Sequence, residues 1–125
     1  DSTAASEAAV EAAAALSQAH GCAVSISGAT DYVVEGQRVV RVHNGHPMMP
    51  RVTGLGCTAS ALCGAFLAVN RSPLAAATGA MAVMGIAGEL AVERSAGPGS
   101  LQASLLDALY NLSREDVARR LRLEA

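Results

Sequence analysis

Along the first part of the chain, the apolar positions change from a helical spacing to an alternating one at Gly21. Residues 2–20 are rich in alanine and predict a helix that Ser2 or Thr3 caps and that Gly21 ends. Residues 22–27 read Cys-Ala-Val-Ser-Ile-Ser, in which apolar and small polar side chains alternate. This short stretch predicts a buried strand after the helix.

A hairpin and a long connection follow this strand. Residues 31–34 and 39–42 flank Glu35-Gly36-Gln37-Arg38, and the glycine at the turn favours a β-hairpin. Residues 43–56 contain three glycines and two prolines and have no regular pattern. Long connections in compact domains tend to carry function, so this one is a candidate for the site.

The second half of the chain predicts four helices. The first runs from Cys57, and Ser72-Pro73 starts the second with a cap residue followed by proline. Residues 97–100, Gly-Pro-Gly-Ser, end that second helix. The apolar face of the third helix is formed by Leu101, Leu105, Leu109 and Leu112.

The last predicted helix opens with a weak capping box from Ser113 to Asp116, and Val117 and Leu121 are expected to face inward. About three strands beside several helices predict a layered α/β fold. Because so small a sheet would leave long edges unpaired, we expect further strands from elsewhere.

Composition narrows the range of functions. Half of the residues are apolar, yet the aromatic residues are only Tyr32, Tyr110 and Phe66, so we expect closely packed layers built on small side chains. The net charge of −2 comes without a basic block, which argues against nucleic-acid binding. The arginines near the C-terminus fit the solvent side of a terminal helix.

Residues 74–92 are nearly uncharged and approach the length of a membrane span. Glu89 interrupts this stretch, and alanine and glycine dominate it, so a buried helix of a soluble protein fits better than a membrane partner.

Two further features bear on location and completeness. The three cysteines lack paired zinc-site spacing and suggest reduced thiols in a cytoplasmic protein. No secretory signal pattern opens the chain. Because the first residue is Asp1 rather than Met, we expect a piece that starts mid-protein or a processed product.

Candidate chemistry lies at residues 52–60, just before the first helix of the second half. Gly54 and Gly56 allow the backbone to turn sharply and to approach a ligand closely. The free amides at the helix start then form an anion site for phosphate or a phosphoryl group in transfer. Cys57 follows directly as a candidate base, because the positive end of a helix stabilises a thiolate. Phosphoryl transfer depends mainly on positioning, so a weak base suffices.

Each of these residues also has a structural interpretation. G-x-G before a helix is a common turn, and single cysteines are often buried packing residues, as we expect for Cys22 and Cys63. The remaining candidates are expected to be structural or surface histidines (His43, His46), core methionines (Met48, Met49) and a turn residue (Asp31). No metal-ligand set is predicted from the residues.

Several segments together resemble hydroxyethylthiazole kinases, which belong to the ribokinase-like superfamily. The similarity runs in order through Ser27-Gly28, Asp31-Tyr32-Val33, Asn44-Gly45-His46-Pro47-Met48-Met49, Val52-Thr53-Gly54-Leu55-Gly56-Cys57, Arg94-Ser95-Ala96-Gly97-Pro98-Gly99-Ser100 and Leu106-Asp107-Ala108-Leu109. It covers nearly the whole chain.

The resemblance implies an α/β fold in which residues 1–125 are the C-terminal half of a single ribokinase-like kinase domain. It also implies ATP-dependent phosphorylation of the hydroxyl of 4-methyl-5-(2-hydroxyethyl)thiazole in thiamine salvage, with Mg²⁺ as a further cofactor. Gly54 would contact the thiazole, and Ser27 would contact ATP. The loop from Gly54 to Cys57 would form the anion hole, with Gly56 as a catalytic part of it, and Cys57 would act as the base.

The resemblance further implies partners and shows two departures. Members are about twice this length. They form trimers with sites between subunits, so this chain is expected to need the other half of the kinase or a homotrimer. The family usually has Thr where Leu55 stands, which removes a hydroxyl near the phosphates. It often has Glu where Ala29 stands, which would weaken the handling of Mg²⁺.

Two alternatives remain open. A hydroxymethylpyrimidine kinase-like enzyme also uses a Gly-Thr-Gly-Cys loop, although residues 44–49 and the Asp31-Tyr32 hairpin favour the thiazole enzyme. A non-catalytic fragment that assembles with another chain is the second alternative.

Overall fold

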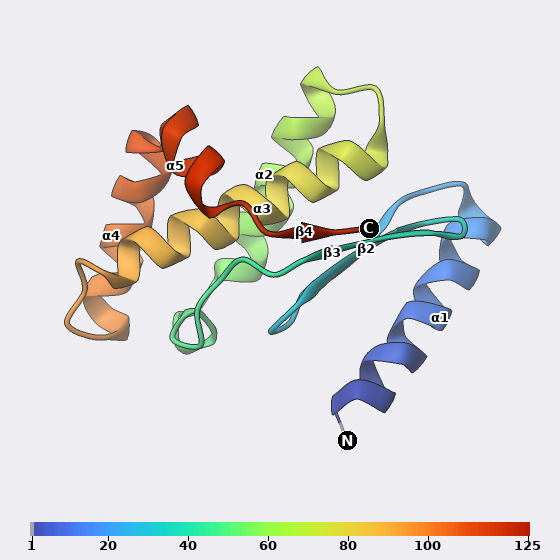
Figure 1. The fold of residues 1–125 in the computed structure, drawn as a ribbon, viewed down its shortest axis with the longest axis horizontal. Coiled ribbons are helices and arrows are strands. Elements are labelled where there is room, and N and C mark those ends of the chain that lie inside the picture. Colours follow the sequence, from blue (N-terminus) through green and yellow to red (C-terminus); the bar gives the residue numbers. More distant parts are fainter. Residues whose placement is uncertain (1) are drawn as a thin grey trace.

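The computed structural model describes the backbone of residues 2–125 and the side chains of residues 5–125 (Figure 1). The elements in chain order are α1 (Ser2–His20), β1 (Val24–Ile26), β2 (Asp31–Glu35), β3 (Arg38–Val42), the 3-10 helix η1 (Met49–Arg51), α2 (Leu55–Val69), α3 (Pro73–Val92), α4 (Pro98–Asn111), α5 (Arg114–Arg120) and β4 (Leu123–Glu124). The mixed α/β architecture predicted from the sequence is confirmed. The predicted cap at Ser2 or Thr3 lies outside the described side chains.

The strands form one sheet in the order β1-β2-β3-β4, and every neighbouring pair is antiparallel. The predicted hairpin is present, with Glu35 opposite Arg38 and Gly36 in the turn at a φ of 61°. A positive φ of this size suits glycine best, which explains the residue at this position. The hairpin is the local feature around which the sheet is built.

Two sequence predictions are corrected, one about the first strand and one about the last helix. The expected buried strand at residues 22–27 is a half-buried strand of three residues, and Cys22 lies before it. The reason is that β1 is paired only with β2 among the described strands. Leu121 is 43% exposed and lies just after α5, so the prediction that it faces inward is wrong. The chain leaves the helix there because the next residues pair with β3 as β4.

One buried hydroxyl joins α1 to the sheet. The Oγ of Ser17 donates to the carbonyl of Cys22 at 2.6 Å and accepts from the amide of Gly36 at 2.7 Å. Gly21 ends the helix as predicted, with a φ of 61° and its amide bonded to the carbonyl of Ser17 at 2.8 Å. The end of α1, the start of β1 and the hairpin turn are therefore held at one point.

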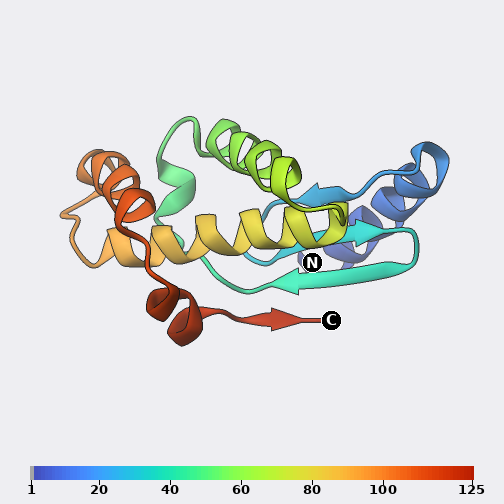
Figure 2. The same cartoon turned by 90° about the horizontal axis from the view of Figure 1, so that it is seen from above.

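The sheet is covered on both faces. Val33 and Val34 are adjacent in β2 and both fully buried, and adjacent strand residues point to opposite faces. Val33 belongs to a core cluster with Leu74 and Met81 of α3, whereas α1 packs against β1 and β2. Figure 2 shows α3 running through the middle of the molecule, with α2 on one side and β3 and β4 on the other. These layers place α3 at the centre of the molecule.

Helix α3 is long and apolar enough to cross a membrane, the single helix of that kind among the described residues. However, 61% of its most apolar window is buried inside the fold. It packs against the sheet, α2 and α4, and contributes Met84, Ala87 and Ala91 to a second core cluster. The burial agrees with the interpretation of this segment as a core helix.

The backbone of the connection after β3 lies directly against α3. A Cβ atom built on Gly85 would lie 2.7 Å from the backbone carbonyl carbon of Asn44. Such a contact is too short for any real Cβ, so the helix or the connection would have to shift. Gly85 therefore sets how closely α3 and residues 43–50 approach.

We expect Gly85→Ala to lower the free energy of unfolding by about 1–3 kcal/mol, because the new methyl group overpacks this contact. The matched control is Gly64→Ala in α2, where a Cβ meets nothing within 4 Å. That control should raise stability by about 0.5–1 kcal/mol through helix propensity. Urea denaturation of both variants checks the expectation, and equal effects would contradict it.

Candidate active site

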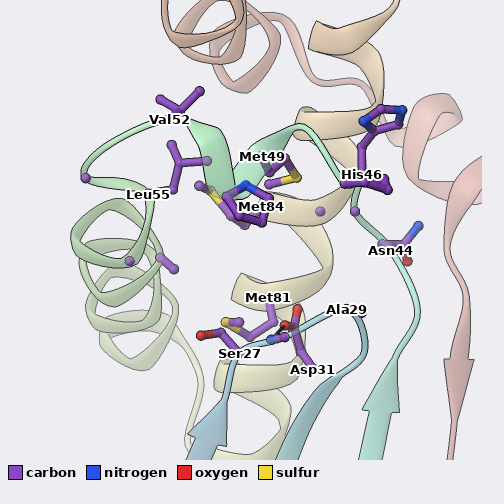
Figure 3. A pocket seen from close by; sticks show the side chains of 18 residues that line it. Ser27, Ala29, Asp31, Asn44, His46, Met49, Val52, Leu55, Met81 and Met84 are labelled. Atoms are coloured by element: carbon purple, nitrogen blue, oxygen red, sulfur yellow. Dashed lines mark hydrogen bonds between the residues drawn. The ribbon is translucent and has the colours of Figure 1, made fainter. Parts of the chain in front are cut away.

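A pocket of about 630 Å³ opens between α3, the β1–β2 loop, the connection after β3 and the start of α2 (Figure 3). Its lining residues are Ser27, Gly28, Ala29 and Asp31, then Asn44, Gly45, His46, Pro47, Met49, Pro50 and Val52, then Gly54, Leu55, Gly56 and Ala59, and Met81, Met84 and Gly85. Figure 3 shows Ser27, Asp31 and Met81 on one side of the space and Leu55, Met49 and Met84 on the other. The pocket is thus formed by segments far apart in the sequence.

The start of α2 supplies the polar end of this pocket. Gly54 is the N-cap with a φ of 88°, and the first helical bond runs from the amide of Thr58 to the carbonyl of Gly54 at 3.1 Å. The amides of Leu55, Gly56 and Cys57 precede that bond, so they take no part in the regular i to i−4 bonding of the helix. They lie at the positive end of the helix dipole, where no acidic side chain occupies the first turn. This geometry suits a bound anion.

The attraction for an anion comes from the backbone. No lysine or arginine is among the pocket residues in the part of the chain that the structure describes. Much of the remaining lining is apolar and includes three methionines, Met49, Met81 and Met84. A ligand that fits this pocket therefore combines an anionic group with an apolar body.

Asp31 is the one carboxylate among the described pocket residues, and it is 8% exposed. Its Oδ1 accepts from the amide of Gly28 at 2.9 Å, which closes the turn after β1. Burial raises the pKa of the Asp31 carboxyl above its ordinary value, and the Gly28 bond lowers it in part. Asp31 was predicted to be a turn residue. It is instead the first residue of β2, although its side chain closes the turn before the strand and also faces the pocket.

The structure brings three of the four predicted site residues together. Ser27, Gly54 and Gly56 all line the pocket. Cys57 is exposed and is not one of the lining residues, although it follows Gly56 directly. Leu55 and Ala29, the two departures from the family pattern, also line the pocket.

Some of the other candidate residues line the pocket, and others contribute to the surrounding structure. His46 and Met49 line the pocket, whereas Met48 packs against a core cluster. The ring of His43 lies 3.4 Å from the Thr30 hydroxyl and 3.1 Å from a carboxylate oxygen of Glu124, so it links strands rather than binding a ligand. No group of three metal-ligating side chains occurs among the described residues.

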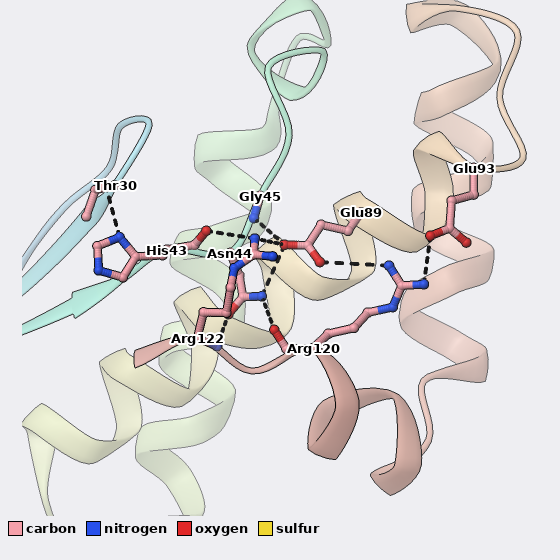
Figure 4. Close-up of polar contacts among 8 residues, drawn as sticks. All are labelled: Thr30, His43, Asn44, Gly45, Glu89, Glu93, Arg120 and Arg122. Carbon is pink, nitrogen blue, oxygen red and sulfur yellow. Dashed lines mark hydrogen bonds and ion pairs between the residues drawn. The ribbon is translucent and has the colours of Figure 1, made fainter. Parts of the chain in front are cut away.

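Sequence reasoning missed the polar contacts behind the pocket (Figure 4). Asn44 is 4% exposed, and its side chain bonds to Glu89 and to the backbone of residues 120 and 122. In the sequence, Glu89 is recognisable only as a charge in an apolar helix. A single carboxylate in such a helix was the available signal, because a buried charge requires partners.

Comparison with known proteins supports this geometry. The model of the hydroxyethylthiazole kinase family matches residues 1–115. The chain belongs to this family. Two relatives described as hydroxyethylthiazole kinase come from Syntrophus aciditrophicus, 59% identical over the whole chain, and Leptospira biflexa, 53% identical over 97% of it.

Among solved structures, the hydroxyethylthiazole kinase protein from Pyrococcus horikoshii matches this family member with a TM-score of 0.90 at 37% identity. The match covers 97% of this chain and 47% of that protein. This chain likewise spans 46% and 45% of the two relatives. It is thus about half the length of the thiazole kinases that it matches.

The charge on Asp31 gives a pH-dependent prediction for this thiazole kinase family member. Because the native state holds the proton more tightly than the unfolded chain, ionisation of Asp31 costs stability as the pH rises above the ordinary value of 3.8. Asp31→Asn keeps the oxygen acceptor for Gly28 and removes that cost. We expect the variant to be at least as stable as the parent at pH 7, with an advantage that shrinks toward pH 4.

Urea midpoints of both proteins between pH 4 and pH 7 check this expectation. The control is Asp107→Asn, which changes an exposed carboxylate on α4. A loss of stability that is specific to Asp31→Asn at neutral pH would contradict the expectation.

Proposed function

We propose that residues 1–125 form the C-terminal part of a single ribokinase-like kinase domain that phosphorylates 4-methyl-5-(2-hydroxyethyl)thiazole with ATP in thiamine salvage. The observation that carries the proposal is the pocket in which Ser27, Gly54 and Gly56 meet the open amides of α2. Family membership and the descriptions of the relatives support the same reaction.

The pocket on this chain is assigned to ATP. Its volume of about 630 Å³ lies within the range of about 300–1,000 Å³ that is usual for ligands larger than a thiazole alcohol. The α2 amides would hold the phosphates and stabilise the charge that develops during transfer. The Ser27 hydroxyl would bond to the nucleotide, and the apolar wall would contact its uncharged part.

The alcohol would approach from the outer side of the loop from Gly54 to Cys57. Cys57 is exposed in the first turn of α2, next to the amides that would hold the transferred phosphoryl group. In this position its sulfur would accept the proton of the attacking hydroxyl. Gly54 would contact the thiazole, since a glycine at this cap leaves the loop surface open.

Mg²⁺ is expected to accompany the ATP phosphates. Magnesium sites of this kind use one or two carboxylates together with phosphate oxygens and water. Asp31 is a buried carboxylate in the pocket, and a nearby cation would offset the cost of burying its charge. Asp31 would therefore orient the ion or its bound water, and the ion would supply neutralisation of phosphate charge.

We further propose that the site is completed by the other half of the kinase or by neighbouring copies in a homotrimer. Helix α2 is strongly apolar but has no buried residue, and Leu67 and Val69 near its end are 49% and 87% exposed. Such a surface is usual where another segment or chain packs. The three free cysteines agree with a cytoplasmic location.

The first experiment is native and denaturing mass spectrometry of the purified protein, followed by a kinase assay with competing alcohols. Phosphorylation of the thiazole alcohol in preference to hydroxymethylpyrimidine supports the proposal. Preference for the pyrimidine, or a folded assembly that binds neither ATP nor either alcohol, would refute it.

Gly56→Ala separates phosphate binding from folding. A Cβ on Gly56 meets no protein atom within 4 Å, and alanine favours the helix, so stability should be unchanged or higher. The methyl group would project from the helix start where phosphate binds, and kcat/KM for ATP should fall about 100-fold. Gly64→Ala in the same helix lies outside the pocket and should leave these kinetics unchanged. Normal kinetics in Gly56→Ala would argue against an anion hole.

Cys57→Ser should lower turnover about tenfold or more while the KM for ATP stays nearly constant, because a serine hydroxyl, unlike a thiol, does not ionise near neutral pH to give a proton acceptor. Cys57→Asp should retain more activity than the serine variant, since a carboxylate accepts protons readily. Steady-state kinetics of the assembled enzyme measure both effects. A large rise in the KM for ATP in both variants would indicate that Cys57 has a packing role instead.

A further inference from the structure

A cluster of charged and polar side chains lies behind residues 44–50, which form one wall of the pocket (Figure 4). It joins the β1–β2 loop, the end of β3, helix α3 and the C-terminal segment. Glu89 of α3 lies at its centre, and its side chain is 12% exposed. We propose that Glu89 is a positioning residue for nucleotide binding, which acts by holding residues 44–50 as a preformed wall of the pocket. This inference rests on the proposed assignment of the pocket to ATP.

The contacts of Glu89 with the wall are direct. One carboxylate oxygen, Oε1, accepts from the amide of Gly45 at 2.9 Å and from the Nδ2 of Asn44 at 3.1 Å. Both residues line the pocket, whereas Glu89 does not. Gly45 has a φ of 130°, a conformation that few other residues adopt, so a fixed partner for its amide helps to hold the turn. Glu89 does not line the pocket itself and is linked by hydrogen bonds to two residues that do.

The charge of Glu89 is balanced by the C-terminal segment. The Nη2 of Arg122 donates to Glu89 Oε1 at 2.7 Å and to the carbonyl of His43 at 2.9 Å. Arg120 lies 3.8 Å from the other carboxylate oxygen. The backbone of the same segment engages Asn44, which donates to the carbonyl of Arg120 at 2.7 Å and accepts from the amide of Arg122 at 2.9 Å.

These arginines lie beyond residue 115, where the family match ends. They tie the end of β3 to α3 from the last ten residues of the chain. Strand β4, which pairs with β3 next to this point, brings Arg122 into place. The last residues of the chain thus contribute to the shape of the pocket without lining it.

Ordering of residues 44–50 by Glu89 would affect the free energy of ligand binding. Residues 44–50 form an irregular wall, and a wall that is already ordered need not lose conformational freedom when a ligand binds. Without the carboxylate, the Gly45 amide, the Asn44 side chain and Arg122 lose the oxygen to which they all donate. The wall would then sample other conformations, and binding would have to order it.

The test compares variants of the assembled enzyme in steady-state kinetics and hydrogen exchange. Glu89→Ala should raise the KM for ATP about tenfold, while kcat and the KM for the alcohol change less than about twofold. Amide exchange across residues 44–50 should accelerate, with exchange in α4 unchanged. Glu89→Gln keeps an oxygen acceptor for Gly45 and should restore the KM for ATP to within about threefold of the parent.

Glu93→Ala is the matched control. Glu93 lies one turn further along and pairs with the same Arg120 at 2.7 Å. It has no hydrogen bond to residues 44–50 in the described part of the chain, so its loss should leave the KM for ATP unchanged. Arg122→Met is a second variant on a half-exposed side chain that should fold normally. It should raise the KM for ATP about threefold.

An active parent enzyme whose Glu89→Ala variant matches Glu93→Ala in KM for ATP overturns this inference and leaves the proposed function intact. If Glu89→Ala does not fold, an unchanged KM for ATP in Arg122→Met overturns it. A parent protein that neither binds ATP nor phosphorylates the alcohol overturns the proposed function and the role of Glu89 with it.

Discussion

The close approach of α3 to the backbone at Asn44 is the contact on which the rest of the structure depends. The helix α3 is buried between the sheet, α2 and α4. These elements can pack closely against it because its side chains are mostly small. Gly85 leaves no room for a Cβ against Asn44. The same helix supplies Met81 and Met84 to the pocket. The position of α3 therefore determines both the core and the width of the pocket.

An irregular connection next to a buried helix presents an energetic difficulty, because its backbone groups need partners away from water. Here a carboxylate from the helix provides them. Burying Glu89 is unfavourable on its own, but two arginines and two donors from the connection compensate for it. The charge that interrupts an otherwise apolar helix is thus what allows a glycine-containing loop to be ordered beside it. This explains how the loop keeps a defined shape without regular secondary structure.

The features that the sequence predicted well are those determined by a few adjacent residues. The hairpin follows from Gly36, and Ser72 accepts from the amide of Ala75 as a cap residue should. The capping box of the last helix is present, with Ser113 and Asp116 exchanging bonds. The hairpin glycine and the two caps act within four residues, so no knowledge of the tertiary fold was needed.

The features that were missed depend on distant parts of the chain. Strand β4 has two residues and exists only because β3 offers an edge, so its sequence carries no strand pattern. The role of Glu89 depends on Arg122, 33 residues away. Resemblance to the family indicated Ser27, Gly54 and Gly56 as one site, and the pocket confirms that they lie together. The exposed position of Cys57 followed from the direction in which α2 leaves the loop, which only the structure defines.

The two sides of the loop from Gly54 to Cys57 have different surroundings. This difference suggests which side of the loop each of the two proposed ligands would meet. On the inner side, the loop faces α3, the β1–β2 loop and residues 44–50 across the pocket. On the outer side, Cys57 and the apolar surface of α2 are exposed. A nucleotide would thus find its site largely preformed on this chain, whereas the alcohol would meet a surface that another segment must cover. The proposed anion hole would lie at the boundary, where a phosphoryl group would pass from the nucleotide to the alcohol.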